Sequence, residues 1–509
     1  MQQKSKDNAR SHPRSRRMLR NVSARALVLG TAALLGITHG VAVAADAPSV
    51  TPGTVAVRLN GRFRLFAFAA SDGDANNNAA GTPSGNVNAA GNGTATGRSK
   101  LASYGIGEFA RLYPGFDGVA ANGLKYGASI EIRQDNVSGA GGGAFGSITA
   151  QDRARGALYI RREWGYVGSE KFGTLRFGST DQPSSLYLTG NFENFNDGGI
   201  DGDAPALLSP TVLVTWPFED VGSYYTTNKL IYLSPQLFGF DGGISFEPST
   251  ANVSINSNCG AGSPVGANFV NAAGAFTTAT GASATGAASA GCDRLSASPN
   301  NAESGRRRNT VDALVRYRGS FGPIGVAATA AGIVGGHVRD NQTGVPFNSN
   351  PLLGTIRNDF DGLSVADFGL VLTYGGLSVG GKYMTGRFNN GGLGLVPKGL
   401  AGGDAALLGT SYTAGPLIVG AHALYYKSAG DLGNAANGRQ RTELGVAAGG
   451  TYSLAPGLVV YLSWVYSQRK QNGFNFVTGQ GVTAASPGGN AFSNKVQAQF
   501  IALGTGFSW

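Results

Sequence analysis

The sequence predicts an all-β fold, a sixteen-stranded antiparallel β-barrel that crosses a membrane. Apolar and polar residues alternate with a period of two in runs of about ten residues, the length that a barrel strand needs to cross a bilayer. Short turns alternate strictly with long glycine- and asparagine-rich connections along the 509 residues, of which 81 are glycine. Nearly every run has one apolar face, and no amphipathic helix pattern is present to cover these faces.

The expected strands come in pairs joined by short turns such as "PGFDGVAANG" (114–123) and "GG" (375–376). A soluble sandwich gives no reason to separate short from long connections, whereas an outer-membrane barrel has short periplasmic turns and long extracellular loops. The even number of strands fits the same class. In chain order the expected strands are 54–70, 103–113, 123–134, 155–167, 173–180, 224–235, 239–248, 309–319, 324–335, 362–374, 377–388, 403–413, 416–427, 441–453, 457–469 and 495–509.

The two faces of individual strands support this arrangement. In 54–66 the odd positions are mostly apolar, whereas the even positions include three arginines and an asparagine. In 124–133 an apolar row again opposes a charged row. Lipid can cover the apolar rows, because a closed barrel pairs every backbone group and leaves no edge. The polar rows are therefore expected to line a lumen. The strand 155–167 breaks the pattern, because Arg162 lies in its otherwise apolar row.

Residues 1–44 are predicted to be a cleaved signal peptide, which leaves 45–509 as the barrel domain. The segment has a basic start, a short apolar stretch and a small-x-small cleavage motif ending at Ala44, and Met18 is an alternative start. It also explains the formal charge of +10. Eight of the 40 basic residues and one of the 30 acidic residues lie in it, so the remaining chain has 32 and 29, a net charge of +3. A nucleic-acid partner is therefore not expected.

The chain ends in "FIALGTGFSW", a strand with an aromatic terminal residue. This is the signal that barrel proteins present to the outer-membrane assembly machinery, with Trp509 as its last residue. The two cysteines, Cys259 and Cys292, both lie in the long loop 249–308, and in an exported protein the expected outcome is a disulfide that closes this loop. Neither has the neighbours that a metal site or a catalytic thiol would need.

Several motifs resemble Gram-negative general porins. "YVGSEKFGTLRFGSTD" resembles the hairpin before the porin constriction loop, and "TTNKLIYLSPQLFGFDGGISFE" resembles the hairpin after it. "EFARLYPGFDGVAANGLKYGASIEIRQDN" and "FENFNDGG" are similar to porins of acetic-acid-type α-proteobacteria. The resemblance implies an outer-membrane homotrimer that passes small hydrophilic solutes and ions, with no cofactor and no catalysis. It also implies that the third extracellular loop, here 181–224, folds into the lumen and forms a constriction.

The expected constriction has an acidic and a basic side, which together would create a field across the pore. No Lys or Arg lies in 181–224. The acidic side of the loop comprises Glu193, Asp197, Asp201, Asp203, Glu219 and Asp220. The basic side, on inferred lumen faces of the wall, comprises Arg58, Arg62, Arg64, Lys125, Arg133 and Arg176. The alternative is that these acids are solvated charges of the rim.

Other functions fit the sequence less well. Asp197, Asp201 and Asp203 have a hint of calcium-loop spacing but lack the distal glutamate, so no metal site is expected. A substrate-specific channel for a sugar or an organic acid would typically have eighteen strands. An outer-membrane hydrolase would need a histidine with a serine or asparagine partner on the outer face. Only His337 and His422 remain after the signal peptide, and His422 falls on the inferred lumen side.

Overall fold

The computed structural model describes the barrel wall and parts of its connections. The described residues are 51–71, 103–135, 158–192, 194–195, 214, 218, 228–249, 268–270, 276–278, 307–337, 361–389, 393–396, 400–430, 440–472, 474–475, 480–481 and 494–509. No helix in these ranges is long and apolar enough to span a membrane. The expected signal peptide, the six acids of 181–224 and both cysteines lie outside these residues, and those expectations stay predictions.

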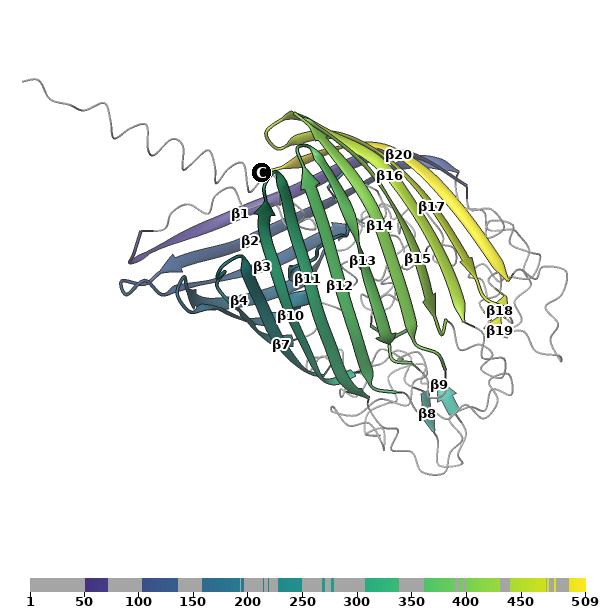
Figure 1. Cartoon of the computed structure of the whole chain (residues 1–509), viewed down its shortest axis with the longest axis horizontal. Helices are drawn as coiled ribbons and strands as arrows, with labels where there is room; N and C mark the ends of the chain where they lie inside the picture. The colour runs from purple at the N-terminus through teal and green to yellow at the C-terminus, as the bar shows by residue number, and fades with distance from the viewer. Residues whose placement is uncertain are drawn as a thin grey trace, which may run out of the picture.

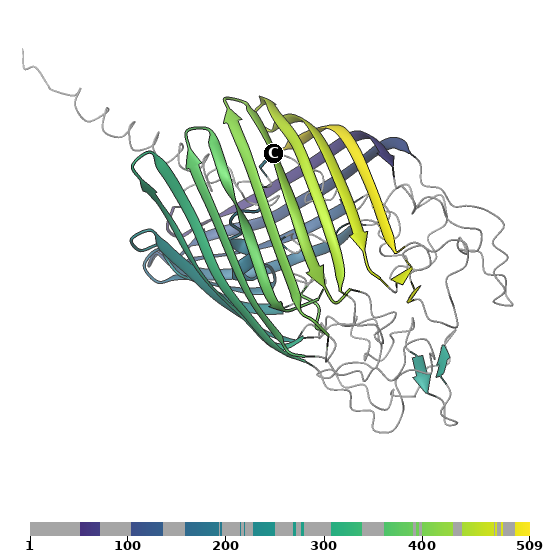
Figure 2. The same cartoon turned by 45° about the vertical axis from the view of Figure 1, so that its right-hand side comes forward.

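Sixteen strands form a closed antiparallel barrel in chain order, as predicted, and β20 pairs with β1 to close it (Figure 1). The hairpin turns gather at one end of the barrel (Figure 2). The barrel strands are β1 (Thr54–Ser71), β2 (Tyr104–Val119), β3 (Lys125–Asp135), β4 (Leu158–Ser169), β5 (Gly173–Ser179), β6 (Asn228–Leu233), β7 (Phe240–Ser249), β10 (Arg307–Phe321), β11 (Ile324–His337), β12 (Leu363–Tyr374), β13 (Leu377–Arg387), β14 (Gly403–Ala414), β15 (Leu417–Ser428), β16 (Arg441–Ala455), β17 (Leu458–Lys470) and β20 (Lys495–Ser508).

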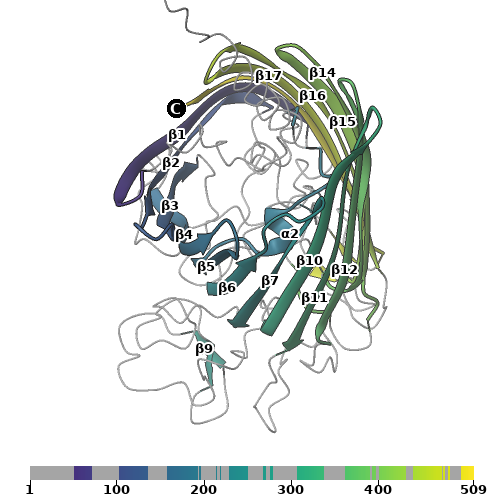
Figure 3. The same ribbon diagram turned by 60° about the vertical axis from the view of Figure 1, so that its left-hand side comes forward.

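Two small sheets and one short helix do not belong to the ring of strands. The pairs β8 (Asn268–Val270) with β9 (Phe276–Thr278), and β18 (Phe474–Asn475) with β19 (Gln480–Gly481), form separate two-stranded sheets. The short helix α2 (Pro183–Leu186) follows β5 and lies inside the ring of strands, where it contacts β7 and β10 (Figure 3).

The predicted alternation of faces holds along the wall. On β1, Val57 is 83% exposed on the outer face, whereas Arg64 is 5% exposed on the inner face. On β7, Phe240, Ile244 and Phe246 are exposed, and the polar residues between them are buried. The apolar rows therefore point away from the lumen, where lipid can cover them.

The second hairpin differs from its prediction, because β2 continues to Val119 through most of the expected turn 114–123. Pro114 pairs with Leu59 of β1, but on the other side the ladder with β3 passes from Leu112 to Gly115 without it. Proline has no N–H to donate, so it fits a strand only where one ladder is interrupted. Pro114, which the sequence analysis assigned to a turn, therefore lies within a strand.

The irregular position of Arg162 has a structural cause. Glu131 of β3 pairs with Arg162, whereas the next residue, Ile132, pairs with Ile160, so Arg161 is an extra residue in β4. A bulge of this kind shifts the side-chain alternation by one position. Ile160 faces outward and is exposed, whereas both arginines are buried on the inner side. The wall of the lumen thus receives two consecutive arginines from one strand.

The C-terminal residue closes the seam between the last and the first strand. The backbone N–H of Trp509 donates to the carbonyl of Gly61, and the N–H of Gly61 donates to the carbonyl of Trp509. The indole ring covers Gly61, since a Cβ placed there would lie 2.1 Å from a ring carbon. A glycine is therefore needed at position 61 for the terminal ring to lie against β1.

Replacing this glycine should impair closure of the barrel. Gly61→Val forces the Trp509 ring to move, at a cost of about 1–3 kcal/mol typical of overpacking. We expect a lower yield of the heat-modifiable folded form after refolding, measured on unheated gels. Ala67→Val, on the same outer face of β1, is the matched control and should fold normally. Equal yields for the two variants would show that the ring does not need this space.

Candidate functional site: an arginine wall and a loop inside the barrel

One side of the lumen is lined by a wall of arginines on β1–β5. Arg62 of β1 lies opposite Arg111 of β2, and Arg111 lies opposite Arg133 of β3, so the three form a row across the strands. Alternation places all three on the inner face, where Arg111 and Arg133 are buried. We call this row, together with the other inward arginines of β1–β5, the arginine wall; these are Arg58, Arg64, Arg161, Arg162 and Arg176.

Aromatic rings lie among the arginines and hold them against the wall. The guanidinium carbons of Arg62, Arg64 and Arg111 lie 5.1, 5.6 and 4.5 Å from the ring centre of Phe109. Arg64 also lies 4.3 Å from the ring centre of Tyr461, on β17. Such contacts attract a cation to the face of the ring without neutralising its charge. The arginine row therefore keeps its positive charge while its side chains are ordered.

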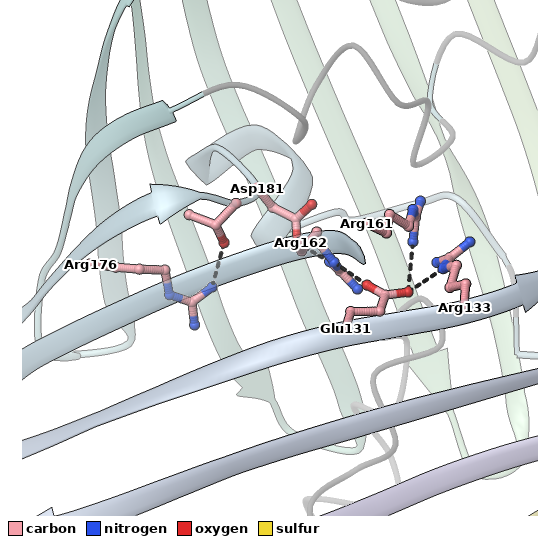
Figure 4. A network of polar contacts seen from close by, with 7 residues as sticks. Glu131, Arg133, Arg161, Arg162, Arg176 and Asp181 are labelled. Atoms are coloured by element: carbon pink, nitrogen blue, oxygen red, sulfur yellow. Dashed lines mark hydrogen bonds and ion pairs between the residues drawn. The ribbon is translucent and has the colours of Figure 1, made fainter. Parts of the chain in front are cut away.

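A buried carboxylate organises the end of the row. Glu131 forms ion pairs with Arg133 and Arg162 and, at 3.3 Å, with Arg161, while Arg162 also pairs with Asp181 (Figure 4). Glu131 has no exposed surface. Two carboxylates thus face three guanidinium groups, so the cluster retains a net positive charge. Because Asp181 begins the segment that follows β5, the cluster also ties that segment to the wall.

The remaining charges of this side lie nearer the hairpin turns. Arg58 pairs with Asp117, and Asp117 accepts a hydrogen bond from the hydroxyl of Tyr166. Lys125 is at the turn end of β3, where its Nζ lies 2.8 Å from Glu170 in the exposed β4–β5 turn. This contact holds the pKa of the Glu170 carboxyl below its usual range, because the ammonium group donates to it.

Arg176 of β5 also belongs to the wall, next to the ring of Trp164. Its guanidinium carbon lies 5.2 Å from the ring centre, and its Nη1 is 3.5 Å from the hydroxyl of Thr180 (Figure 4). The ring of Trp164 lies near the inward Arg162 and Arg176, and the hydroxyl of Tyr166 donates to the inward Asp117, so both side chains face the lumen. Their inward position follows from the bulge at Arg161, after which even positions of β4 point inside.

The segment after β5 enters the lumen and is fixed to β10, three strands further along the wall. Asp312 of β10 accepts hydrogen bonds from the backbone N–H of Ser184, at 2.9 Å, and from its hydroxyl, at 2.7 Å. Both residues are buried. These bonds hold α2 inside the barrel, which agrees with the prediction that the third loop folds inward.

Further along, the segment packs against inner glycines of the opposite strands. The ring of Phe192 lies over Gly409 of β14, and the ring of Phe195 lies over Gly420 of β15, where a Cβ would come within 2.7 and 2.3 Å of ring carbons. Phe195 also packs edge-on against His422, with 5.7 Å between ring centres. The glycine-rich composition of these strands therefore has a function in packing, because side chains there would exclude the loop.

The wall beneath this segment is largely apolar, in contrast to the arginine wall. Phe192, Phe195, Val214 and Phe218 are buried and form one cluster with inward residues of the second half of the barrel. Those wall residues are Ile333, Val365, Val371, Met384, Ala405, Leu407, Leu424, Ala447, Val465 and Phe500. The inserted segment thus covers a side of the lumen that is mostly apolar but also holds the buried ion pairs Lys382–Asp367 and Arg469–Glu443, and the opposite side is basic.

The six basic residues predicted from the sequence all lie on the inner face, but they do not form one group. Arg62, Arg64 and Arg133 belong to the central row, whereas Arg58 and Lys125 pair with acids nearer the turns. Sequence reasoning missed Arg111, Arg161, Arg162 and Asp181 as site residues. Alternation would have placed Arg111 on the inner face if the sequence of 103–113 had shown clearly which of its faces is the inner one.

His422, read from the sequence as a lumen or packing residue, lies against the inserted segment. Its Nδ1 is 3.2 Å from the carbonyl oxygen of Asn191, and it is buried. Within the described ranges, no group of three His, Cys, Asp or Glu residues could hold a metal ion.

Comparison with known proteins identifies the family. A family profile described as "Gram-negative porin" matches residues 30–472. The chain belongs to the Gram-negative porin family. This porin is accordingly an outer-membrane β-barrel and a diffusion channel, with its short turns in the periplasm and its long connections on the cell exterior. Comparison with curated proteins gave no match.

Solved structures similar to this porin include three bacterial proteins. An anion-selective porin from Comamonas acidovorans is 13% identical with a TM-score of 0.44, over 90% of this chain and 100% of that one. The trimer form of OmpT from Vibrio cholerae is 13% identical with a TM-score of 0.46, over 90% and 100%. OmpF of Salmonella typhi, in complex with daunomycin, is 12% identical with a TM-score of 0.46, over 89% and 97%.

Removing the buried carboxylate of the arginine wall should change both stability and selectivity. Glu131→Gln leaves Arg133, Arg161 and Arg162 without their shared partner, and we expect a loss of roughly 3 kcal/mol, as for a broken buried pair. In planar bilayers, the reversal potential in a salt gradient should shift towards anions. Glu163→Gln removes the same charge from the exposed outer face of β4 and should shift neither property. Equal shifts would mean that Glu131 does not act on the permeation path.

Proposed function

We propose that this porin passes small hydrophilic solutes and ions through an opening between the arginine wall and the inserted segment that follows β5. The single observation that supports this opening is that the described part of the inserted segment lies against one side of the lumen and leaves the basic side uncovered. The inserted segment packs its aromatic side chains on the apolar side. The free part of the lumen is then the part bordered by charged residues of β1–β5.

We further propose that the acids of the loop face the arginine wall across this opening. The acids concerned are Glu193, Asp197, Asp201, Asp203, Glu219 and Asp220. Asp181, at the start of the same segment, pairs with Arg162, which supports this orientation. Opposed rows of carboxylates and guanidinium groups create a field across a narrow pore, which orients dipolar solutes and filters ions. Transport in this proposal has no chemical step, and His422 acts only in packing.

The proposal includes assembly as a homotrimer, which the resemblance to general porins implies, and closure of the loop 249–308 by a Cys259–Cys292 disulfide. The sixteen strands favour a diffusion pore over an eighteen-stranded substrate-specific channel. Trp509 is proposed as the residue that the assembly machinery recognises, and its position at the seam supports a role in closing the barrel.

The decisive measurement is the conductance of the purified protein in planar lipid bilayers. We expect ohmic channels in the nanosiemens range that close in three steps, because each protomer of a trimer carries its own pore. Single-step closure would contradict the trimer but not the pore. Absence of conductance from protein that is folded on unheated gels would contradict the diffusion function itself.

The proposed field predicts opposite effects for its two sides. Exchanging Asp197, Asp201 and Asp203 together for Asn should shift the reversal potential towards anions. Exchanging Arg62, Arg64 and Arg111 together for Gln should shift it towards cations. Lys171→Gln, in the exposed β4–β5 turn, is a control that should leave the reversal potential unchanged. If the aspartate variant behaves like this control, these three residues do not line the constriction.

A further inference from the structure

The described part of the inserted segment runs across the inner wall from β10 to β15. It begins inside the ring of strands with α2 (Figure 3), whose Ser184 is hydrogen-bonded to β10. Further along, the side-chain amide of Asn194 donates a hydrogen bond of 3.0 Å to the hydroxyl of Ser411 on β14. The carbonyl oxygen of Asn191 contacts His422 on β15. The segment is therefore held against one side of the lumen at several points along its length.

A glycine lies in the wall at three of the points where the segment crosses it. At Gly369 of β12, an added Cβ would lie less than 3.0 Å from the carbonyl oxygen of Thr189. At Gly409 of β14 and Gly420 of β15, it would lie less than 3.0 Å from ring carbons of the segment. Non-bonded carbon atoms in contact are about 3.5–4.0 Å apart. The segment can lie at its present depth because these three residues, which we call the contact glycines, have no side chain.

The aromatic rings of the segment lie in gaps between side chains of the wall. On β15 the inner neighbours of Gly420 are Ile418 and His422, and the His422 ring is buried. On β14 the inner positions on either side of the glycine are Leu407 and Ser411, which are also buried. Side chains on both sides of each gap oppose a movement of the ring along the strand. A ring that is pushed out of its gap therefore moves away from the wall.

The wall itself cannot yield at these positions. The strands β12, β14 and β15 each have a paired neighbour on both sides, so two ladders of hydrogen bonds fix the backbone of each contact glycine. To restore normal contact, a methyl group at Gly420 would displace the Phe195 ring by about 1 Å. The displacement is directed towards the opening. The depth of the segment and the width of the opening are therefore coupled.

We propose that the contact glycines set the size limit of the pore. This inference rests on the proposed opening between the inserted segment and the arginine wall. The opening becomes narrower as the segment moves from β12–β15 towards β1–β5, and the width of a pore decides which hydrophilic solutes pass. The contact glycines are thus positioning residues for permeation, although they lie beneath the segment and do not border the opening themselves.

Single-channel conductance and liposome swelling test this proposal on the purified full-length porin. Gly420→Ala should lower the conductance by roughly 1.5-fold, because a displacement of about 1 Å is a sizeable part of the width of a diffusion pore. It should also lower the rate of sucrose entry relative to that of arabinose, since a narrower pore hinders the larger sugar more. Gly409→Ala should change both quantities in the same direction.

The matched control is Gly332→Ala on β11. This glycine is exposed on the outer face, and an added Cβ would meet nothing within 4 Å. The conductance and the ratio of the two sugar rates should therefore stay at their wild-type values. Unheated gels confirm that each variant is folded.

A compensating substitution separates the proposed effect from a general disturbance of the barrel. Phe195→Leu removes the ring carbons that the new methyl group would meet. The double variant with Gly420→Ala and Phe195→Leu should therefore regain the wild-type conductance and sugar ratio. Phe195→Leu alone should lower neither quantity. A purely structural role of the glycine would not produce this recovery.

Three outcomes would overturn the proposal. Gly420→Ala and Gly409→Ala keep the wild-type conductance and sugar ratio, or they raise the conductance, which would mean that the segment leaves the wall instead of shifting. Alternatively, the double variant stays at the level of Gly420→Ala. Each comparison starts from a conducting wild type. Failure of the proposed pore function is distinguishable, because it would appear as a lack of conductance in the wild type itself.

Discussion

Closure of the sheet is the constraint on which the rest of this structure depends. Within a bilayer, each backbone N–H and C=O must find a partner in the protein, and only a closed ring of strands provides one for every strand edge. The pairing of β20 with β1, completed by Trp509 against Gly61, satisfies the last edge. Once the ring is closed, alternation fixes which residue meets lipid and which meets the lumen, without any helix to cover the sheet.

This alternation gives the lumen two different inner surfaces. On β1–β5 the inner positions are arginines whose charge is retained beside Phe109 and only partly balanced by Glu131. On β11–β17 and β20 many inner positions are glycine or apolar residues, which provide room and contact for the inserted segment. The same strand geometry thus gives a basic wall on one side and an anchor for the inserted segment on the other. Hydrogen bonds that Ser184 donates to Asp312 hold the start of the inserted segment against β10, between these two sides.

Much of this architecture could be predicted from the sequence. In a strand the side chains alternate with a period of two, so the position of a residue shows which face of the sheet it lies on. The strand count, the closed barrel and the inner position of Arg62 or Arg133 follow from it. The bulge at Arg161 could not be predicted, because an extra residue in one strand is only defined by its pairing with another. The extension of β2 through Pro114 could not be predicted for a related reason. Whether a proline ends a strand depends on which of the two neighbouring ladders it interrupts. The pairing of Asp181 with Arg162 depends on the path of a loop that has no periodicity.

The bulge in β4 also affects what a solute meets on its way through. Consecutive inward residues of a regular strand are about 6.6 Å apart, but Arg161 and Arg162 are separated by a single rise of about 3.3 Å. With Arg133 and the two carboxylates beside them, all these charges lie well within a Debye length of about 8 Å. The fields of these groups therefore overlap, so that a passing ion meets the cluster as one charged patch and not as separate residues.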